Sequence, residues 1–147
     1  MAEAPDYVLL WATAVDQQGF RTQDRNRTWT SRLSDAVLFA TALRNLLRAV
    51  EYAKEQSSDP AKQAAIQGAL DSFSGKVPHW SRIRNALEHF DEYDQGRGRG
   101  QRTPFVVRWT NSTDGVLSVG DGLEMNVAEA FEAAAELHLA FEQAWAS

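Results

Sequence analysis

The sequence contains no cysteine and only three lysines among its 15 basic residues. The absence of cysteine excludes disulfide bonds, thiolate metal ligands and cysteine nucleophiles. No apolar run approaches the roughly 20 residues that cross a bilayer. Residues 1–16 lack the basic segment of a secretory signal peptide, and Asp6 and Asp16 bracket their short apolar stretch. These absences predict a cytoplasmic protein with no membrane partner.

The length and composition are those of one globular domain. The chain has 147 residues, of which 44% are hydrophobic and 24% charged, and its net charge is −5 at pH 7. A domain of this size buries about two-thirds of its unfolded surface. The negative net charge argues against a protein that coats long stretches of nucleic acid. Phosphate-binding loops, dinucleotide fingerprints, zinc-ligand spacings and serine-hydrolase elbows are missing, so we expect no metal and no cofactor.

Arginine is concentrated in three segments, residues 21–32, 82–84 and 97–108, whereas acidic residues crowd the C-terminal segment. A guanidinium group binds phosphate with two parallel hydrogen bonds, which lysine cannot do. The preference for arginine therefore fits phosphate recognition, but a bias in genomic base composition explains it equally well.

The apolar spacing predicts helices over residues 6–18, 31–56, 60–74, 78–95 and 126–146. We expect the first to end at Gly19, although its apolar run also fits a strand. The second has the clearest stripe, formed by Leu33, Val37, Ala40, Leu43, Leu47 and Val50. Asp59 before Pro60 predicts the N-cap of the third helix, and we expect that helix to bury Ala65, Ile66, Ala69, Leu70 and Phe73 and to stop at Gly75.

Residues 103–125 change to an alternating pattern that predicts a hairpin. Its turn is expected at Asp114-Gly115, and a third short strand is possible at residues 123–125. Asn126 followed by Glu129 predicts an N-cap for the last helix. The fold class is therefore mainly α: a single helical domain over residues 1–147, a bundle of about five helices with a small β-hairpin inserted before the C-terminal helix.

The fourth predicted helix carries the most informative polar residues. Its apolar stripe runs from Trp80 to Phe90, and we expect Arg84, Asn85 and His89 on the opposite side, together with Glu88 and Glu92. Asn85 and His89 are four residues apart and are therefore neighbours on a helix, as are Arg84 and Glu88. A cation, an amide, a carboxylate and an imidazole would then share one surface.

The segment Arg84-Asn85-Ala-Leu-Glu-His89 resembles the signature of the HEPN superfamily, in which arginine and a polar residue precede a histidine. The resemblance covers residues 31–95 and 126–146. It implies a helical bundle that forms a homodimer with the motif helices facing each other across a cleft. Many members are metal-independent endoribonucleases of toxin–antitoxin or antiphage systems, so an antitoxin or other partner protein is implied as well. Other members are non-catalytic dimerisation, adaptor or nucleotide-binding modules.

The resemblance also implies roles for three catalytic residues. His89 would exchange protons with the ribose 2′-OH or the leaving 5′ oxygen, which suits an imidazole because its pKa lies near neutrality. Arg84 would stabilise the charge that develops on the scissile phosphate, and Asn85 would orient His89 or bind a phosphate oxygen. The expected products carry 2′,3′-cyclic phosphate ends.

Four further arginines are candidate RNA or phosphate ligands: Arg82, Arg97, Arg99 and Arg102. The last three belong to the glycine-rich segment 96–102, which is also explained as a helix C-cap whose cations offset the helix dipole.

Simpler interpretations of the polar residues stand beside the catalytic one. Arg84 and Glu88 are also explained as a surface ion pair. His138 lies on the apolar stripe of the last helix and is expected to be a hydrogen-bonded core residue, and His79 is expected to be structural or exposed.

Overall fold

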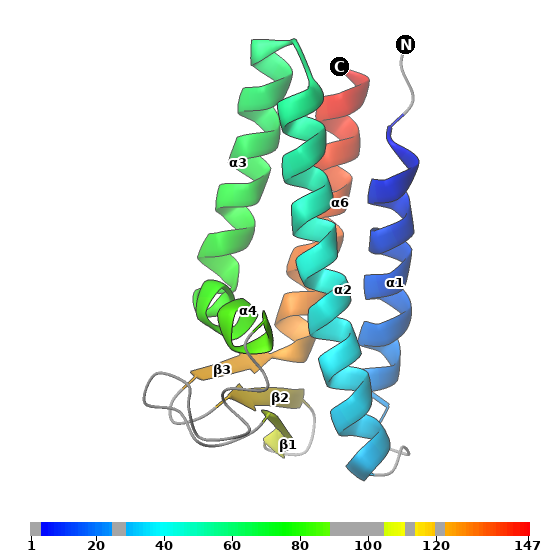
Figure 1. Cartoon of the computed structure of the whole chain (residues 1–147), viewed down its shortest axis with the longest axis vertical. Helices are drawn as coiled ribbons and strands as arrows, with labels where there is room; N and C mark the ends of the chain where they lie inside the picture. Colours follow the sequence, from blue (N-terminus) through cyan, green and yellow to red (C-terminus); the bar gives the residue numbers. More distant parts are fainter. Residues whose placement is uncertain (1–3, 25–28, 89–104, 111–113, 120–122) are drawn as a thin grey trace.

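Four long helices run up and down beside one another and form the body of the protein (Figure 1). The structure is a computed structural model, and it describes residues 4–24, 29–88, 105–110, 114–119 and 123–147. Within these ranges the helices are α1 (Asp6–Thr22), α2 (Trp29–Gln56), α3 (Pro60–Lys76), α4 (Trp80–Glu88) and α6 (Val127–Ala146). The short α4 lies at the end of the bundle where α3 ends (Figure 1). The predicted helical class is confirmed.

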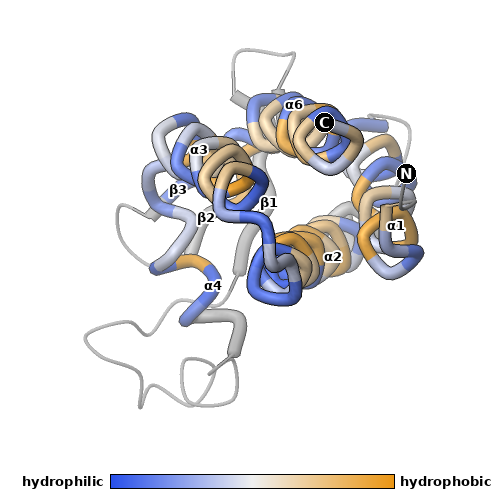
Figure 2. Tube along the Cα trace, turned by 90° about the horizontal axis from the view of Figure 1, so that it is seen from above, coloured by the Kyte–Doolittle hydropathy of each residue, from blue (hydrophilic) through white to orange (hydrophobic). Residues whose placement is uncertain are grey.

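The apolar faces of α1, α2, α3 and α6 point toward a common axis, as the end-on view in Figure 2 shows. The large side chains that are fully buried come from all four helices and include Val8, Phe39, Leu43, Leu46, Val50, Ile66, Phe73, Leu137 and Phe141. This burial explains why the amphipathic stripe of α2 predicted its helix so clearly. In α3, by contrast, Ala65 is exposed although burial was expected, whereas its neighbour Ile66 is fully buried.

The predicted caps of α3 and α6 are both present. The Asp59 carboxylate accepts hydrogen bonds from the backbone N–H groups of Ala61 and Lys62 at 3.0 and 3.4 Å, and Pro60 is the first helical residue. The Asn126 side chain accepts a hydrogen bond from the N–H of Glu129 at 2.9 Å. Each cap pairs N–H groups that have no partner inside the helix.

The expected helix end at Gly19 is wrong, because α1 continues to Thr22. Gly19 is buried inside the helix, where a Cβ atom would lie 2.2 Å from Cδ2 of Phe131 and 3.1 Å from Cε1 of Phe39. Glycine is present there because α6 and α2 approach α1 closely, and not because the chain turns. The strand alternative for this segment is excluded. In α3 the expected stop at Gly75 is also displaced, since the helix ends at Lys76.

A three-stranded antiparallel sheet packs at the same end of the bundle as α4 (Figure 1). Its strands are β1 (Phe105–Thr110), β2 (Asp114–Val119) and β3 (Leu123–Asn126), in the order β1-β2-β3. The predicted third strand is thus present. The turn was misplaced, because Thr110 pairs with Asp114 and Trp109 with Gly115. Asp114 and Gly115 therefore belong to β2. Leu117 pairs with Met125, and both are buried in the core.

Candidate functional site

Helix α4 positions the described part of the motif. Trp80 and Ile83 are buried at 6% and 0% exposure and fix the helix on the end of the bundle. Trp80 also packs edge-on against Phe73 of α3, with ring centroids 6.4 Å apart. Of the candidate residues on α4, Arg82 and Asn85 are exposed and Arg84 is partly buried.

We had expected Arg84 to lie opposite the apolar stripe, but it lies beside the stripe. It follows Trp80 by four residues, which places the two side chains on neighbouring positions of the helix, only about 40° apart in projection. Both residues line a hollow between α2, α3 and α4. Asn85 is rotated by about a further 100° and is exposed. The structure therefore separates Arg84 from Asn85, directing one toward the bundle and the other away from it.

The remaining candidates cannot be placed beside these residues. His89, Arg97, Arg99 and Arg102 lie outside the described residues, as do the predicted helix end near residue 95 and the segment 96–102. The backbone of Glu88 is the last of α4, and its side chain is not described, so the suggested pair with Arg84 stays a prediction.

The hollow has a volume of about 190 Å³ and contains residues that the sequence analysis did not single out. On α2 these are Arg44 and Arg48, which lie on the same side of the helix, one turn apart. Arg44 flanks the buried Leu43, so its position beside the apolar stripe was a signal in the sequence. The sequence alone does not show that α3 and α4 pack against this side of α2, and this packing places Arg44 and Arg84 at one hollow.

Two of the arginines that line this hollow each have a guanidinium nitrogen with unsatisfied hydrogen-bonding capacity. Nε of Arg44 and Nε of Arg84 are shielded from solvent, and neither has an acceptor in the part of the chain that the structure describes. A buried donor without a partner costs about 1–3 kcal/mol, so such donors are seldom left unpaired without reason. The hollow also contains two exposed carboxylates, Glu51 and Asp71, and the hydroxyl groups of Ser74 and Ser81.

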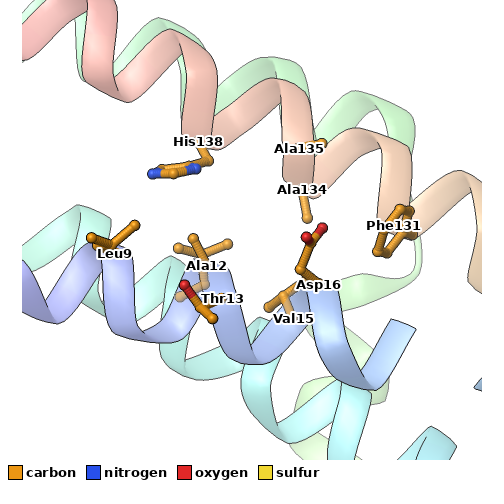
Figure 3. Close-up of a pocket in the computed structure, with 10 residues that line it drawn as sticks. Leu9, Ala12, Thr13, Val15, Asp16, Phe131, Ala134, Ala135 and His138 are labelled. Carbon is orange, nitrogen blue, oxygen red and sulfur yellow. The ribbon is translucent and has the colours of Figure 1, made fainter. Parts of the chain in front are cut away.

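A second hollow, of about 290 Å³, lies between α1 and α6 (Figure 3). Asp16 of α1 and His138 of α6 face it from opposite walls, and alanines such as Ala12 and Ala134 keep it open. We had expected His138 to be a core residue, but 26% of its side chain is exposed. Its Nε2 lies 3.0 Å from Oε1 of Glu142, one turn further along α6.

Two other features, a metal-binding cluster and a membrane-spanning helix, are absent from the part of the chain that the structure describes. No group of three or more histidine, aspartate or glutamate side chains with metal-binding geometry occurs among the described residues. Within the same ranges, no helix combines the length and the hydropathy that crossing a bilayer requires. No protein-family model, no curated protein and no solved structure matched this chain in the comparisons.

Proposed function

We propose that this protein is a metal-independent endoribonuclease of HEPN type that acts as a homodimer, with Arg84, Asn85 and His89 as its catalytic residues. The observation that carries the proposal is the state of Arg84. Its Nε donor is shielded from solvent and has no acceptor among the described residues, so it can donate a hydrogen bond to a phosphate oxygen without breaking an existing Nε hydrogen bond. Arg82 and Asn85 are exposed on the same helix and are accessible to RNA.

The chemistry follows from the residue types. The ribose 2′-OH attacks phosphorus, the bond from phosphorus to the 5′ oxygen breaks, and the products are a 2′,3′-cyclic phosphate and a free 5′-OH. His89 accepts the proton of the 2′-OH or donates one to the leaving oxygen. Arg84 stabilises the charge on the nonbridging oxygens. No metal is needed to generate a nucleophile, because the substrate supplies its own.

The test is incubation of RNA with purified protein in EDTA, beside Arg84→Ala, His89→Ala and Arg21→Gln. Arg21 is exposed on α1 and serves as the matched control for loss of one positive charge. We expect cyclic-phosphate products from the parent protein and from Arg21→Gln. The rate should fall about 100-fold or more in the other two variants. Intact RNA under all conditions, with folded protein, would exclude the nuclease.

The alternative is a non-catalytic binding module, either a dimerisation adaptor or a nucleotide-binding domain. One observation favours it: Arg84 lines a hollow within its own chain, away from the exposed side of α4 where Asn85 lies. In that case Arg84→Ala changes ligand binding, and RNA stays intact with every variant.

A further inference from the structure

We propose that Arg44 and Arg84 form a binding site for a phosphate dianion in the hollow between α2, α3 and α4. The site shares Arg84 with the proposed nuclease but does not depend on RNA cleavage. It adds a residue from α2, far from the motif helix in the sequence, and it needs no second copy of the chain.

The first argument is the combination of two unsatisfied donors. Arg44 and Arg84 come from different helices, line the same hollow, and each has a solvent-shielded Nε without an acceptor among the described residues. Two guanidinium groups at one hollow repel each other, and each unpaired buried donor adds a further cost. One tetrahedral anion with several acceptor oxygens offsets the repulsion and, once the two side chains turn toward it, gives each Nε–H an acceptor, since a guanidinium group binds phosphate through paired N–H groups.

The second argument is the distribution of charge along the hollow. Three arginines, Arg44, Arg48 and Arg84, line it together with two carboxylates, Glu51 and Asp71, so the sum of their formal charges is positive. Helices α2 and α3 run in opposite directions from the turn at residues 57–59 (Figure 1), and Arg44 and Arg48 lie farther from that turn along α2 than Glu51 does. Gln67 Nε2 donates to Asp71 at 2.8 Å, and Lys54 Nζ donates to Gln67 Oε1 at 2.6 Å, so Asp71 already accepts a hydrogen bond from within the chain.

The third argument is the start of α4. Pro78, Trp80 and Ser81 line the hollow, so the N-terminal turn of α4 borders it. The first N–H groups of a helix carry a partial positive charge and bind phosphate readily. Those of Trp80 and Ile83 already donate to Val77 O and His79 O, so the N–H groups of Ser81 and Arg82 are the ones offered to an anion here. The hydroxyl groups of Ser74 and Ser81 are further donors at this end. The volume of about 190 Å³ exceeds by far the roughly 10–15 Å³ that a single water needs, so an oxyanion can be accommodated.

The test is thermal unfolding of the whole chain in increasing inorganic phosphate, at constant ionic strength set by chloride. We compare the parent protein with Arg44→Gln, Arg84→Gln and the control Arg21→Gln. Phosphate stabilises most proteins weakly by exclusion from their surfaces, so the difference between variants carries the result. We expect Tm to rise by about 2–6 °C more in the parent and in Arg21→Gln than in the other two variants. An equal rise in all four proteins overturns the site.

A second readout localises binding in the parent protein and does not depend on the arginine variants. Trp80 lines the hollow, and its indole N–H signal in a ¹⁵N-correlation spectrum can be assigned with Trp80→Phe. Phosphate should shift this signal more than the indole signals of Trp11 and Trp145. An unshifted Trp80 signal at saturating phosphate contradicts the proposal.

Adenosine 5′-monophosphate and adenosine separate two sources of the phosphate group. Tighter binding of the nucleotide than of inorganic phosphate, with no effect of adenosine, identifies a nucleotide or a phosphorylated RNA end as the ligand. Equal binding identifies free phosphate. RNA cleavage is measured on the same preparations, so loss of phosphate binding and loss of nuclease activity are recorded separately.

Discussion

Gly19 of α1 lies directly against the ring of Phe131 of α6, so closely that a Cβ atom at position 19 would be 2.2 Å from Cδ2 of the ring. This contact brings the first and last helices of the bundle together, and Cε1 of Phe39 on α2 would lie 3.1 Å from the same Cβ position. A methyl group cannot be added there without moving an aromatic ring in the core.

We expect Gly19→Ala to lower the free energy of unfolding by about 1–3 kcal/mol, the usual cost of overpacking a core. Alanine is otherwise the better helix former, so the sign tests the contact itself. Gly68 of α3 is the matched control, because a Cβ at that position meets nothing within 4 Å. Gly68→Ala should stabilise by about 0.5–1 kcal/mol. Urea unfolding measures both, and stabilisation by Gly19→Ala would contradict the close approach.

The cap of α3 gives a second prediction. Asp59→Ala removes the acceptor for the N–H groups of Ala61 and Lys62 and should cost about 0.5–2 kcal/mol of unfolding free energy. Asp59→Asn keeps a side-chain oxygen and should retain most of that stability. Thermal or urea unfolding of the two variants decides the matter, and equal loss in both would show that the cap contributes through charge alone.

The third prediction is that ionisation of Tyr7 lowers the free energy of unfolding at high pH. Burial raises the pKa of its hydroxyl above the ordinary value, and charge on Tyr52, whose ring centroid is 5.6 Å away, raises it further. The folded state therefore favours the neutral phenol. This contribution is complete below the unfolded-state pKa of about 10 and is lost as pH rises through the higher folded-state pKa.

Replacing the phenol tests that linkage. Tyr7→Phe keeps the ring and removes the titrating group, so its unfolding free energy should fall less than that of the parent between about pH 8 and about pH 11. Urea unfolding across this range gives the slopes. Identical slopes for the two proteins would mean that Tyr7 does not contribute.

Dimerisation through α4 is the fourth prediction. A dimer has twice the chain mass of 16.4 kDa, which light scattering measures directly. Asn85 is exposed on α4, and Asn85→Glu places a like charge twice at a two-fold contact, so it should shift the mass toward the monomer. Gln17→Glu, on the exposed side of α1, adds the same charge and should leave the mass unchanged. A monomer in the parent protein at micromolar concentration would exclude a site composed of two chains.

Several features that depend on nearby residues were predicted correctly from the sequence. The α2 stripe and the caps at Asp59 and Asn126 are local, because each is set by residues within a few positions. Gly19 failed because the partner that explains it, Phe131, is far along the chain. A glycine at a helix end and a glycine at a helix crossing look the same until the crossing is known.

The candidate site divides in the same way. The polar residues of α4 were found by spacing alone, but the direction of Arg84 depends on the hollow between α2 and α3. Arg44 was missed because an arginine beside an apolar stripe is an ordinary amphipathic residue. Only the packing of three helices brings Arg84 of α4 to the same hollow as Arg44.

No residue separates β3 from α6, since Asn126 ends the strand and also caps the helix. A single pair of backbone angles, φ −73° and ψ 118°, therefore sets the direction in which α6 leaves the sheet. The side chain of the same residue accepts the hydrogen bond from Glu129 N–H that starts the helix. One substitution at Asn126 would consequently disturb the end of the sheet and the start of the last helix together.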